Sequence, residues 1–115
     1  MTDLDKLQEL VVGFREERDW KQFHNPKDTA ISLLLEASEF LEHFQWKNET
    51  EVADHIREKK SAVSEELADV LYWVLLISHD LDISLDSALR AKIEQNRLKY
   101  PVEKAKGKHT KYTSL

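Results

Sequence analysis

Hydrophobic residues recur along this chain at intervals of three and four, which is the period of an amphipathic α-helix. The first run follows Thr2, a residue type that can cap a helix, and extends to about Arg18, with apolar positions at Leu4, Leu7, Val11 and Phe14. The pattern then breaks in the segment WKQFHNP. Asn25 can cap a second helix, and Pro26 suits its first turn, where a backbone N–H would have no helical partner.

The second helix is predicted from about Pro26 to Trp46. At about 100° per residue, seven apolar side chains fall within one arc of roughly 120°, and this arc is predicted to face the core: Ala30, Leu33, Leu34, Ala37, Phe40, Leu41 and Phe44. Glu36 and Glu39 lie at the edge of the arc, so they border the core without interrupting it. Glu42 is expected to be a bystander.

Two further helices complete the predicted fold. The third follows the polar link KNETE, in which Thr50 is a possible cap, and reaches about Asp80, with a possible break near Ser61. The fourth has a stripe at Leu85, Ala88, Leu89 and Ile93, and Pro101 must end it. We therefore expect an all-α, four-helix bundle over residues 1–101. The lysine-rich tail, residues 102–115, is expected to be loosely ordered or to form an arm on a partner subunit.

Composition narrows the classes of function. The chain has 115 residues, 41% hydrophobic and 34% charged, which favours one domain of long helices. Its net charge of −5 argues against general binding to nucleic-acid polymers, which requires a basic surface. The chain has no long apolar run and no signal-peptide core at its start, so we expect a cytoplasmic protein without a membrane partner. Because cysteine is absent, oxygen and imidazole are the available metal ligands.

Two acidic pairs border the most apolar helices. Glu36 and Glu39 stand three apart in the second helix, and Glu66 and Asp69 repeat that spacing in the third. If the helices pack antiparallel, the four carboxylates meet at the edge of the core and repel one another unless cations neutralise them. Mg²⁺ is the expected counter-ion, with Mn²⁺ as a substitute. The alternative is an ordinary solvated face, and the spacing alone does not decide between the two.

Aromatic and polar residues near these pairs are candidate ligand contacts. Rings can stack on a base while amide and imidazole groups contact its edge, which points to Trp20, Gln22, Phe23, His24, Trp46 and Trp73. In the fourth helix, Lys92 and Asn96 share a face that can hold phosphate oxygens. The alternatives are that the rings fill a core or a subunit interface, and that the cations only answer the helix dipole. His43 and His79 are expected to be ordinary paired or exposed histidines.

Four segments, ERDWKQFHNP, EASEFLEHFQW, EELADVLYW and KIEQNRLKYP, together resemble the MazG-like nucleotide pyrophosphohydrolases, in particular the dCTP pyrophosphatase branch. The resemblance implies a homodimer or homotetramer and Mg²⁺-dependent cleavage of a nucleoside triphosphate, such as dCTP or a related pyrimidine nucleotide, to the monophosphate and pyrophosphate. It implies that the metal ligands are Glu36, Glu39, Glu66 and Asp69. It also implies base or sugar contacts by Trp20, Gln22, His24 and Trp46, and phosphate contacts by Lys92 and Asn96.

The expected mechanism is in-line attack of a water near the α-phosphorus, with Glu36 or Glu39 accepting its proton and the metal neutralising charge. A di-iron carboxylate bundle is a rival metalloenzyme, but it normally requires Glu-x-x-His on two helices, and this sequence contains none. The non-enzymatic alternative is a helical oligomerisation or adaptor module whose acidic residues are only surface.

Overall fold

The computed structural model describes residues 1–115, and every regular element in it is helical. The elements are α1 (Asp3–Glu17), η1 (Lys21–Phe23), α2 (Pro26–Glu42), α3 (Glu49–Glu58), α4 (Lys60–Asp80), α5 (Leu85–Lys99), α6 (Val102–Ala105) and η2 (Tyr112–Ser114), where η denotes a 3₁₀ turn. The chain divides into two compact units, Met1–Asp82 and Ile83–Leu115. The all-α prediction is confirmed, and none of the helices combines the length and apolar character that a bilayer span requires.

The first two helices start where their capping residues predict. In α1, the Thr2 hydroxyl accepts from the Asp5 N–H at 3.1 Å, and the Asp5 carboxylate accepts from the Thr2 N–H at 3.0 Å. In α2, Asn25 Oδ1 accepts from the Asp28 N–H at 2.9 Å, and Pro26 occupies the first turn. These bonds satisfy N–H groups that the helix itself leaves unpaired.

One predicted helix end is wrong, and one break that the sequence leaves open is present. α2 ends at Glu42, short of Trp46, because Trp46 has a φ of 67°, outside helical geometry, and the chain turns there toward a new cap at Asn48. The predicted third helix is two helices, α3 and α4. The chain leaves helical geometry at Lys59 (φ −120°, ψ 30°), two residues before Ser61, near which the sequence allows a break.

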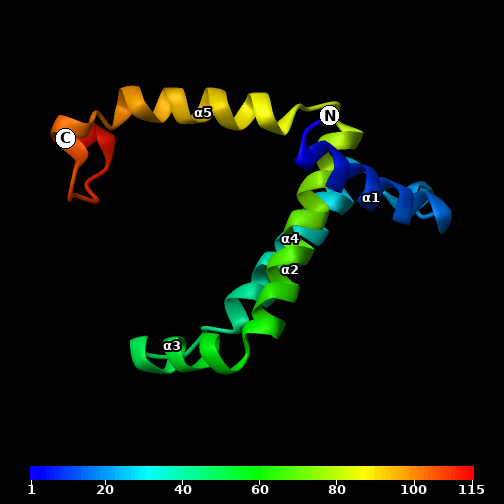
Figure 1. Ribbon diagram of the computed structural model, residues 1–115, viewed down its shortest axis with the longest axis horizontal. Helices are drawn as coiled ribbons and strands as arrows, with labels where there is room; N and C mark the ends of the chain where they lie inside the picture. The colour runs from blue at the N-terminus through cyan, green and yellow to red at the C-terminus, as the bar shows by residue number, and fades with distance from the viewer. The chain divides into compact units, whose positions relative to one another are not determined.

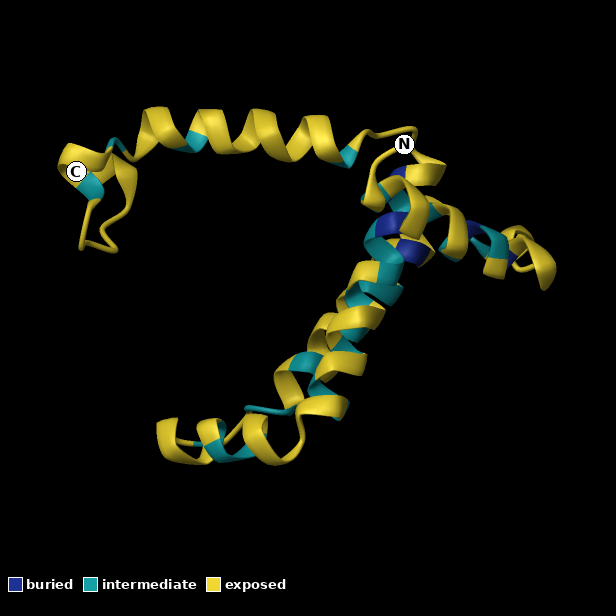
Figure 2. Ribbon diagram, in the orientation of Figure 1, coloured by how far each residue is buried: buried dark blue, intermediate teal, exposed yellow.

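Within the first unit, α2 and α4 run antiparallel side by side, α1 lies across one end of α4, and α3 lies at its other end (Figure 1). The buried residues gather where α1 meets α4 (Figure 2). The Gln8 amide of α1 donates there to the Leu75 carbonyl at 3.1 Å and to the Ser78 hydroxyl at 2.9 Å. The apolar part of this small core is Val12, Leu75 and Leu76.

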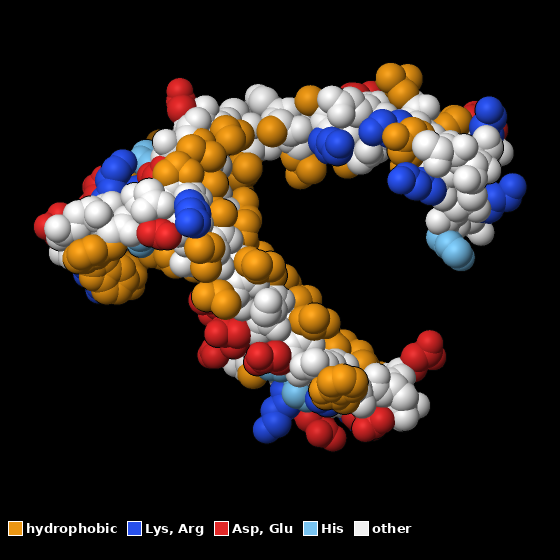
Figure 3. Space-filling view, turned by 180° about the vertical axis from the view of Figure 1, so that it is seen from behind, with side chains coloured by type: hydrophobic (Ala, Val, Ile, Leu, Met, Phe, Trp, Pro, Cys, Tyr) orange, Lys and Arg blue, Asp and Glu red, His pale blue; other side chains and the backbone are white.

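The apolar arc predicted as the core face of α2 is only partly covered within this chain. Leu34 and Leu41 are 66% and 60% exposed, whereas Leu33, Phe40 and Phe44 are half-buried. The reason is geometric, because one helix packed along another covers only a narrow stripe of its surface. Figure 3 shows hydrophobic side chains along the α2–α4 pair. The exposed apolar set on these two helices is Ile31, Leu34, Leu35, Leu41, Leu67 and Leu71.

The second unit contains α5 and the tail. α5 ends at Lys99, just before Pro101, as predicted. The tail forms α6 and η2, and the Tyr112 ring packs edge-on to Tyr100 with centroids 5.9 Å apart, while Lys99 Nζ lies 4.9 Å from the Tyr112 centroid. The tail therefore forms local structure, whereas the sequence allows a loosely ordered tail. Its use as an arm on a partner, and a functional boundary between residues 101 and 102, stay predictions.

Candidate functional site

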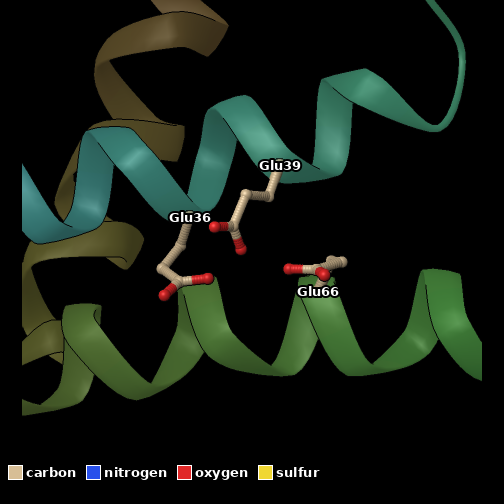
Figure 4. Close-up of side chains that lie close together, drawn as sticks. All are labelled: Glu36, Glu39 and Glu66. Atoms are coloured by element: carbon tan, nitrogen blue, oxygen red, sulfur yellow. The ribbon is translucent and has the colours of Figure 1, made fainter.

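Three carboxylates meet between α2 and α4. Figure 4 shows Glu36 and Glu39 pointing from α2 toward Glu66 on α4. One oxygen from each lies within 4.8 Å of the others. The spacing of three puts Glu36 and Glu39 on one side of α2, and the antiparallel course of α4 brings Glu66 opposite them. The structure thus brings together three of the four predicted metal ligands, and we call these three residues the acidic cluster.

The acidic cluster is electrostatically unsatisfied. Burial, followed by the nearby carboxylates of Glu39, Asp69 and Glu66, raises the pKa of Glu36 to about 7. Burial and Glu39 also raise the pKa of Glu66. Glu36 Oε2 and Glu66 Oε2 are buried without a hydrogen-bond partner. Because a buried polar atom normally has a partner, these two oxygens indicate that a group from outside the chain belongs here.

The donor set fits a divalent cation. The cluster offers only carboxylate oxygens, which are the ligands that Mg²⁺ and Mn²⁺ prefer. A cation would satisfy the two orphaned oxygens and relieve the repulsion that raises the pKa values. Asp69, the fourth predicted ligand, is exposed on α4 one turn after Glu66, and it faces the cleft described next.

An apolar cleft of about 540 Å³ adjoins the acidic cluster. Glu36 and Asp69 line part of it, and the other lining residues are Leu10, Val11, Phe14, Trp20, His24, Tyr72 and Trp73. Edge-to-face contacts hold the wall together, with ring centroids 5.7 Å apart for Phe14 and Trp20 and 5.3 Å apart for His24 and Trp73. The cleft therefore places a surface suited to a flat ring directly beside carboxylates.

The sequence predicts some of the cleft residues as ligand contacts and not others. Trp20, His24 and Trp73 are predicted contacts, and all three line the cleft. Leu10 and Phe14 of α1 are not predicted, because their helical spacing signals only a core stripe. The contribution of α1 depends on its packing across α4, which no local pattern reveals.

Three other predicted contacts lie outside the cleft lining. The Gln22 amide donates to the Asp19 carbonyl at 2.8 Å and to its carboxylate at 3.1 Å. Phe23 is 66% exposed and Trp46 is 93% exposed. A φ of 67° is rare for a residue as bulky as tryptophan, so the turn at Trp46 holds that side chain in solvent against the local backbone preference.

The predicted phosphate contacts, Lys92 and Asn96, lie on α5 in the second unit. Lys92 is exposed and Asn96 is half-buried. Their spacing of four puts them on one face of that helix, as the sequence predicts.

The histidines at the ends of α2 and α4 are ordinary, as expected. His43 Nδ1 lies 2.8 Å from His55 Nε2, so the two rings share one hydrogen bond where α3 meets the end of α2. His79 is exposed.

Arg15 is a site residue that the sequence pattern does not reveal. Its side chain is 0% exposed, and its two terminal nitrogens donate to both carboxylate oxygens of Asp80 at 2.7 Å. The hydrogen bond with Asp80 is the main cause that raises the pKa of Arg15 and lowers that of Asp80. Arg15 Nη1 also lies 3.4 Å from Nδ1 of His24, which lines the cleft. The one signal in the sequence is that Arg15 continues the apolar stripe one turn after Val11.

Comparisons with known proteins agree on one group of relatives. The model of the MazG-like family matches residues 31–115. The chain is 36% identical to dCTP pyrophosphatase 1 of Mus musculus and 34% identical to that of Homo sapiens, over 97% of this chain and 67% of each relative. The crystal structure of a pyrophosphatase from Archaeoglobus fulgidus has a TM-score of 0.82 and 34% identity, and the match covers 88% of this chain and 94% of that one.

Proposed function

Because the chain belongs to the MazG-like family and is an enzyme of the diphosphatase type, we propose that it hydrolyses dCTP or a related pyrimidine nucleoside triphosphate to the monophosphate and pyrophosphate. One observation carries this proposal: the acidic cluster and the aromatic cleft share Glu36. A nucleotide can therefore place its phosphates at the carboxylates while its base lies among the rings. The adaptor alternative gives no reason for this juxtaposition.

The metal in this proposal is Mg²⁺, with Mn²⁺ as a substitute. Glu36, Glu39 and Glu66 would hold it, and Asp69 would complete the set from the cleft side. When bound, the ion supplies positive charge that stabilises the negative charge developing on the phosphates in the transition state. The support is the chemistry of the donor set and the two orphaned oxygens.

The chain's own residues orient the substrate and accept a proton. Trp20 and Trp73 offer ring faces for the base, and His24 offers its imidazole to the base or sugar. A water attacks the α-phosphorus in line with the leaving pyrophosphate, and Glu36 or Glu39 accepts its proton. Glu36 is the better placed of the two, because it lines the cleft and also belongs to the acidic cluster.

The remaining expected contacts belong to an assembled enzyme in this proposal. Six large apolar side chains of α2 and α4 are exposed in the single chain, which supports a homodimer or homotetramer. In that assembly Gln22, Phe23 and Trp46 contact the base or sugar, and Lys92 and Asn96 contact phosphate. A cytoplasmic location and the absence of nucleic-acid and membrane partners likewise stay predictions.

A nucleotide panel tests the function. The full-length protein is incubated with each ribo- and deoxynucleoside triphosphate, with and without Mg²⁺, and pyrophosphate and orthophosphate are measured separately. We expect pyrophosphate and a monophosphate in equal amounts, only with the metal, and fastest with dCTP or a related pyrimidine nucleotide. Orthophosphate as the first product, or no product from any nucleotide, would contradict the proposal, and the second result would favour the adaptor.

A further inference from the structure

The buried Arg15–Asp80 pair ends at a residue of the cleft, and this contact has a chemical consequence. We propose that Arg15 holds His24 as a neutral imidazole with its proton on Nε2, so that the cleft presents an N–H donor to an acceptor atom of the nucleotide. Arg15 is then a positioning residue that acts through His24. The nature of the ligand rests on the function proposed above, whereas the position of the proton does not.

The first step is that Arg15 cannot move or change charge. Its side chain is fully buried, and both terminal nitrogens are bound to Asp80 at 2.7 Å. A guanidinium stays protonated in proteins and has five N–H donors but no acceptor. The fork of two parallel bonds fixes its plane, so the second proton on Nη1 has a set direction.

The second step is that this donor selects one form of His24. Nη1 lies 3.4 Å from Nδ1 of His24, and two donors at that distance would oppose each other. Nδ1 must therefore carry the lone pair. Burial and the positive charge of Arg15 lower the pKa of His24, which disfavours the imidazolium. A neutral ring with an unprotonated Nδ1 carries its proton on Nε2.

The third step is that the Nε2–H is free for a ligand. Arg15 is the one side chain within hydrogen-bond distance of the His24 ring, and no protein group pairs with Nε2. The ring lines the cleft and packs edge-on against Trp73, with centroids 5.3 Å apart. A donor on an otherwise apolar wall suits an acceptor of the ligand, such as a pyrimidine carbonyl or ring nitrogen, or a sugar oxygen.

The position of the proton is tested by long-range ¹H–¹⁵N NMR on the ¹⁵N-labelled full chain at pH 8, without nucleotide or metal. The His24 signals are assigned by their loss in His24→Gln. We expect a protonated Nε2 and an unprotonated Nδ1 in the wild type, and a several-fold larger population of the Nδ1–H form in Arg15→Met. Lys21→Gln is the matched control, because Lys21 Nζ lies 3.8 Å from Asp80 but makes no hydrogen bond to the His24 ring. The bond from the His24 backbone N–H to the Lys21 carbonyl is kept in this variant, since it uses only the backbone.

Three results would overturn the role of Arg15: a proton on Nδ1 in the wild type, a wild-type imidazolium at pH 8, or an unchanged proton position in Arg15→Met. If Arg15→Met does not fold, the wild-type spectrum still decides the tautomer. In that case Asp80→Asn is used in place of Arg15→Met. This variant keeps the arginine but weakens its bonds to residue 80, so the guanidinium is held less firmly and the Nδ1–H population should rise.

The donor role is tested by kinetics with the best nucleotide of the panel. The amide nitrogen of glutamine reaches about as far as Nε2, and that of asparagine about as far as Nδ1. His24→Asn should therefore raise KM about five- to tenfold more than His24→Gln, with similar kcat, as expected for one lost hydrogen bond. Equal KM values for the two variants would reject the donor. An inactive wild type would reject the proposed function and leave the NMR result standing.

Discussion

Two groups of charged side chains, one joining α1 to α4 and the other joining α2 to α4, are opposite in their electrostatics. Arg15 and Asp80 form a matched pair, with both carboxylate oxygens bound and the pKa of Asp80 lowered. Glu36, Glu39 and Glu66 form a like-charged cluster, with a pKa raised to about 7 at Glu36 and two oxygens left without partners. Each group borders the same cleft, through His24 in the first case and Glu36 in the second.

The contrast indicates which charges serve the fold and which serve a ligand. Arg15 and Asp80 neutralise each other within the chain, although Arg15 Nε is buried without a partner, so removal of the pair should mainly affect folding. A cluster that the chain leaves unsatisfied lowers stability until something binds, so its removal should mainly affect function. Variants and pH should therefore separate the two groups.

The largest expected effect is the loss of stability on Arg15→Met. This change leaves Asp80 without its partner, and breaking a buried ion pair from one side costs about 3–5 kcal/mol. Because the Asp80 side chain is 20% exposed, we expect a value at the lower end, measured by urea unfolding. Lys21→Gln, which alters only an exposed contact to Asp80, should change stability by less than about 0.5 kcal/mol. Equal losses of unfolding free energy in Arg15→Met and Lys21→Gln would show that the buried pair contributes no more to stability than the exposed contact.

Glu39→Gln should have an effect of similar size, but on turnover and not on stability. With Mg²⁺ saturating, we expect kcat to fall about 10²- to 10³-fold, which corresponds to about 3–4 kcal/mol. The metal-free variant should be at least as stable as the wild type, because one repelling charge is gone. Glu42→Gln is the matched control on the same helix, since Glu42 is outside the acidic cluster. A stable variant with wild-type turnover would exclude Glu39 from the site.

The two groups should also give opposite pH dependence in the metal-free protein. Glu36 has a pKa of about 7 in the fold against an ordinary value of 4.5, so its protonation adds stability that is complete below 4.5 and lost as pH rises through 7. Asp80 has a lowered pKa, so its contribution is complete above the ordinary value of 3.8 and lost as pH falls below it. Thermal unfolding should therefore show the Glu36 contribution lost as pH rises through 7 and the Asp80 contribution lost as pH falls below 3.8.

Mg²⁺ should offset the loss of stability that the metal-free protein shows as pH rises through 7. At pH 8 a tenfold excess over Kd should stabilise the protein by about 1.4 kcal/mol, and the gain should fade on acidification through pH 7, as protons compete for Glu36. A gain in Tm from Mg²⁺ that is the same at pH 5 and pH 8 would contradict a carboxylate site with this pKa.

The smallest expected effect is on a residue outside both groups. Trp46→Ala should raise KM about three- to tenfold with little change in Tm, because the ring is 93% exposed and contributes little to packing. An unchanged KM across the nucleotide panel would reject Trp46 as a base contact. A drop in Tm would instead show that the ring packs against another subunit.

Much of the fold can be predicted from local sequence signals. The predictions fail where the backbone conformation has no local signal in the sequence. Asn25 and Pro26 mark a helix start because the side-chain oxygen and the missing N–H act within one turn. The turn at Trp46 has no such signal, since a positive φ is unfavourable for tryptophan and is imposed by the rest of the structure. The predicted core face of α2 is too wide because periodicity defines an apolar arc but not how many neighbours cover it.

The sequence alone predicts the acidic residues. A spacing of three on an amphipathic helix places Glu36 beside Glu39, and a second helix repeats the pattern with Glu66. What only the tertiary structure decided is which charges are matched. Asp80, the partner of Arg15, is 65 residues away in the sequence, and the burial of Arg15 depends on how α1 crosses α4. Electrostatic energies depend on distance and burial in three dimensions, so one carboxylate became a structural anchor and three became a candidate metal site.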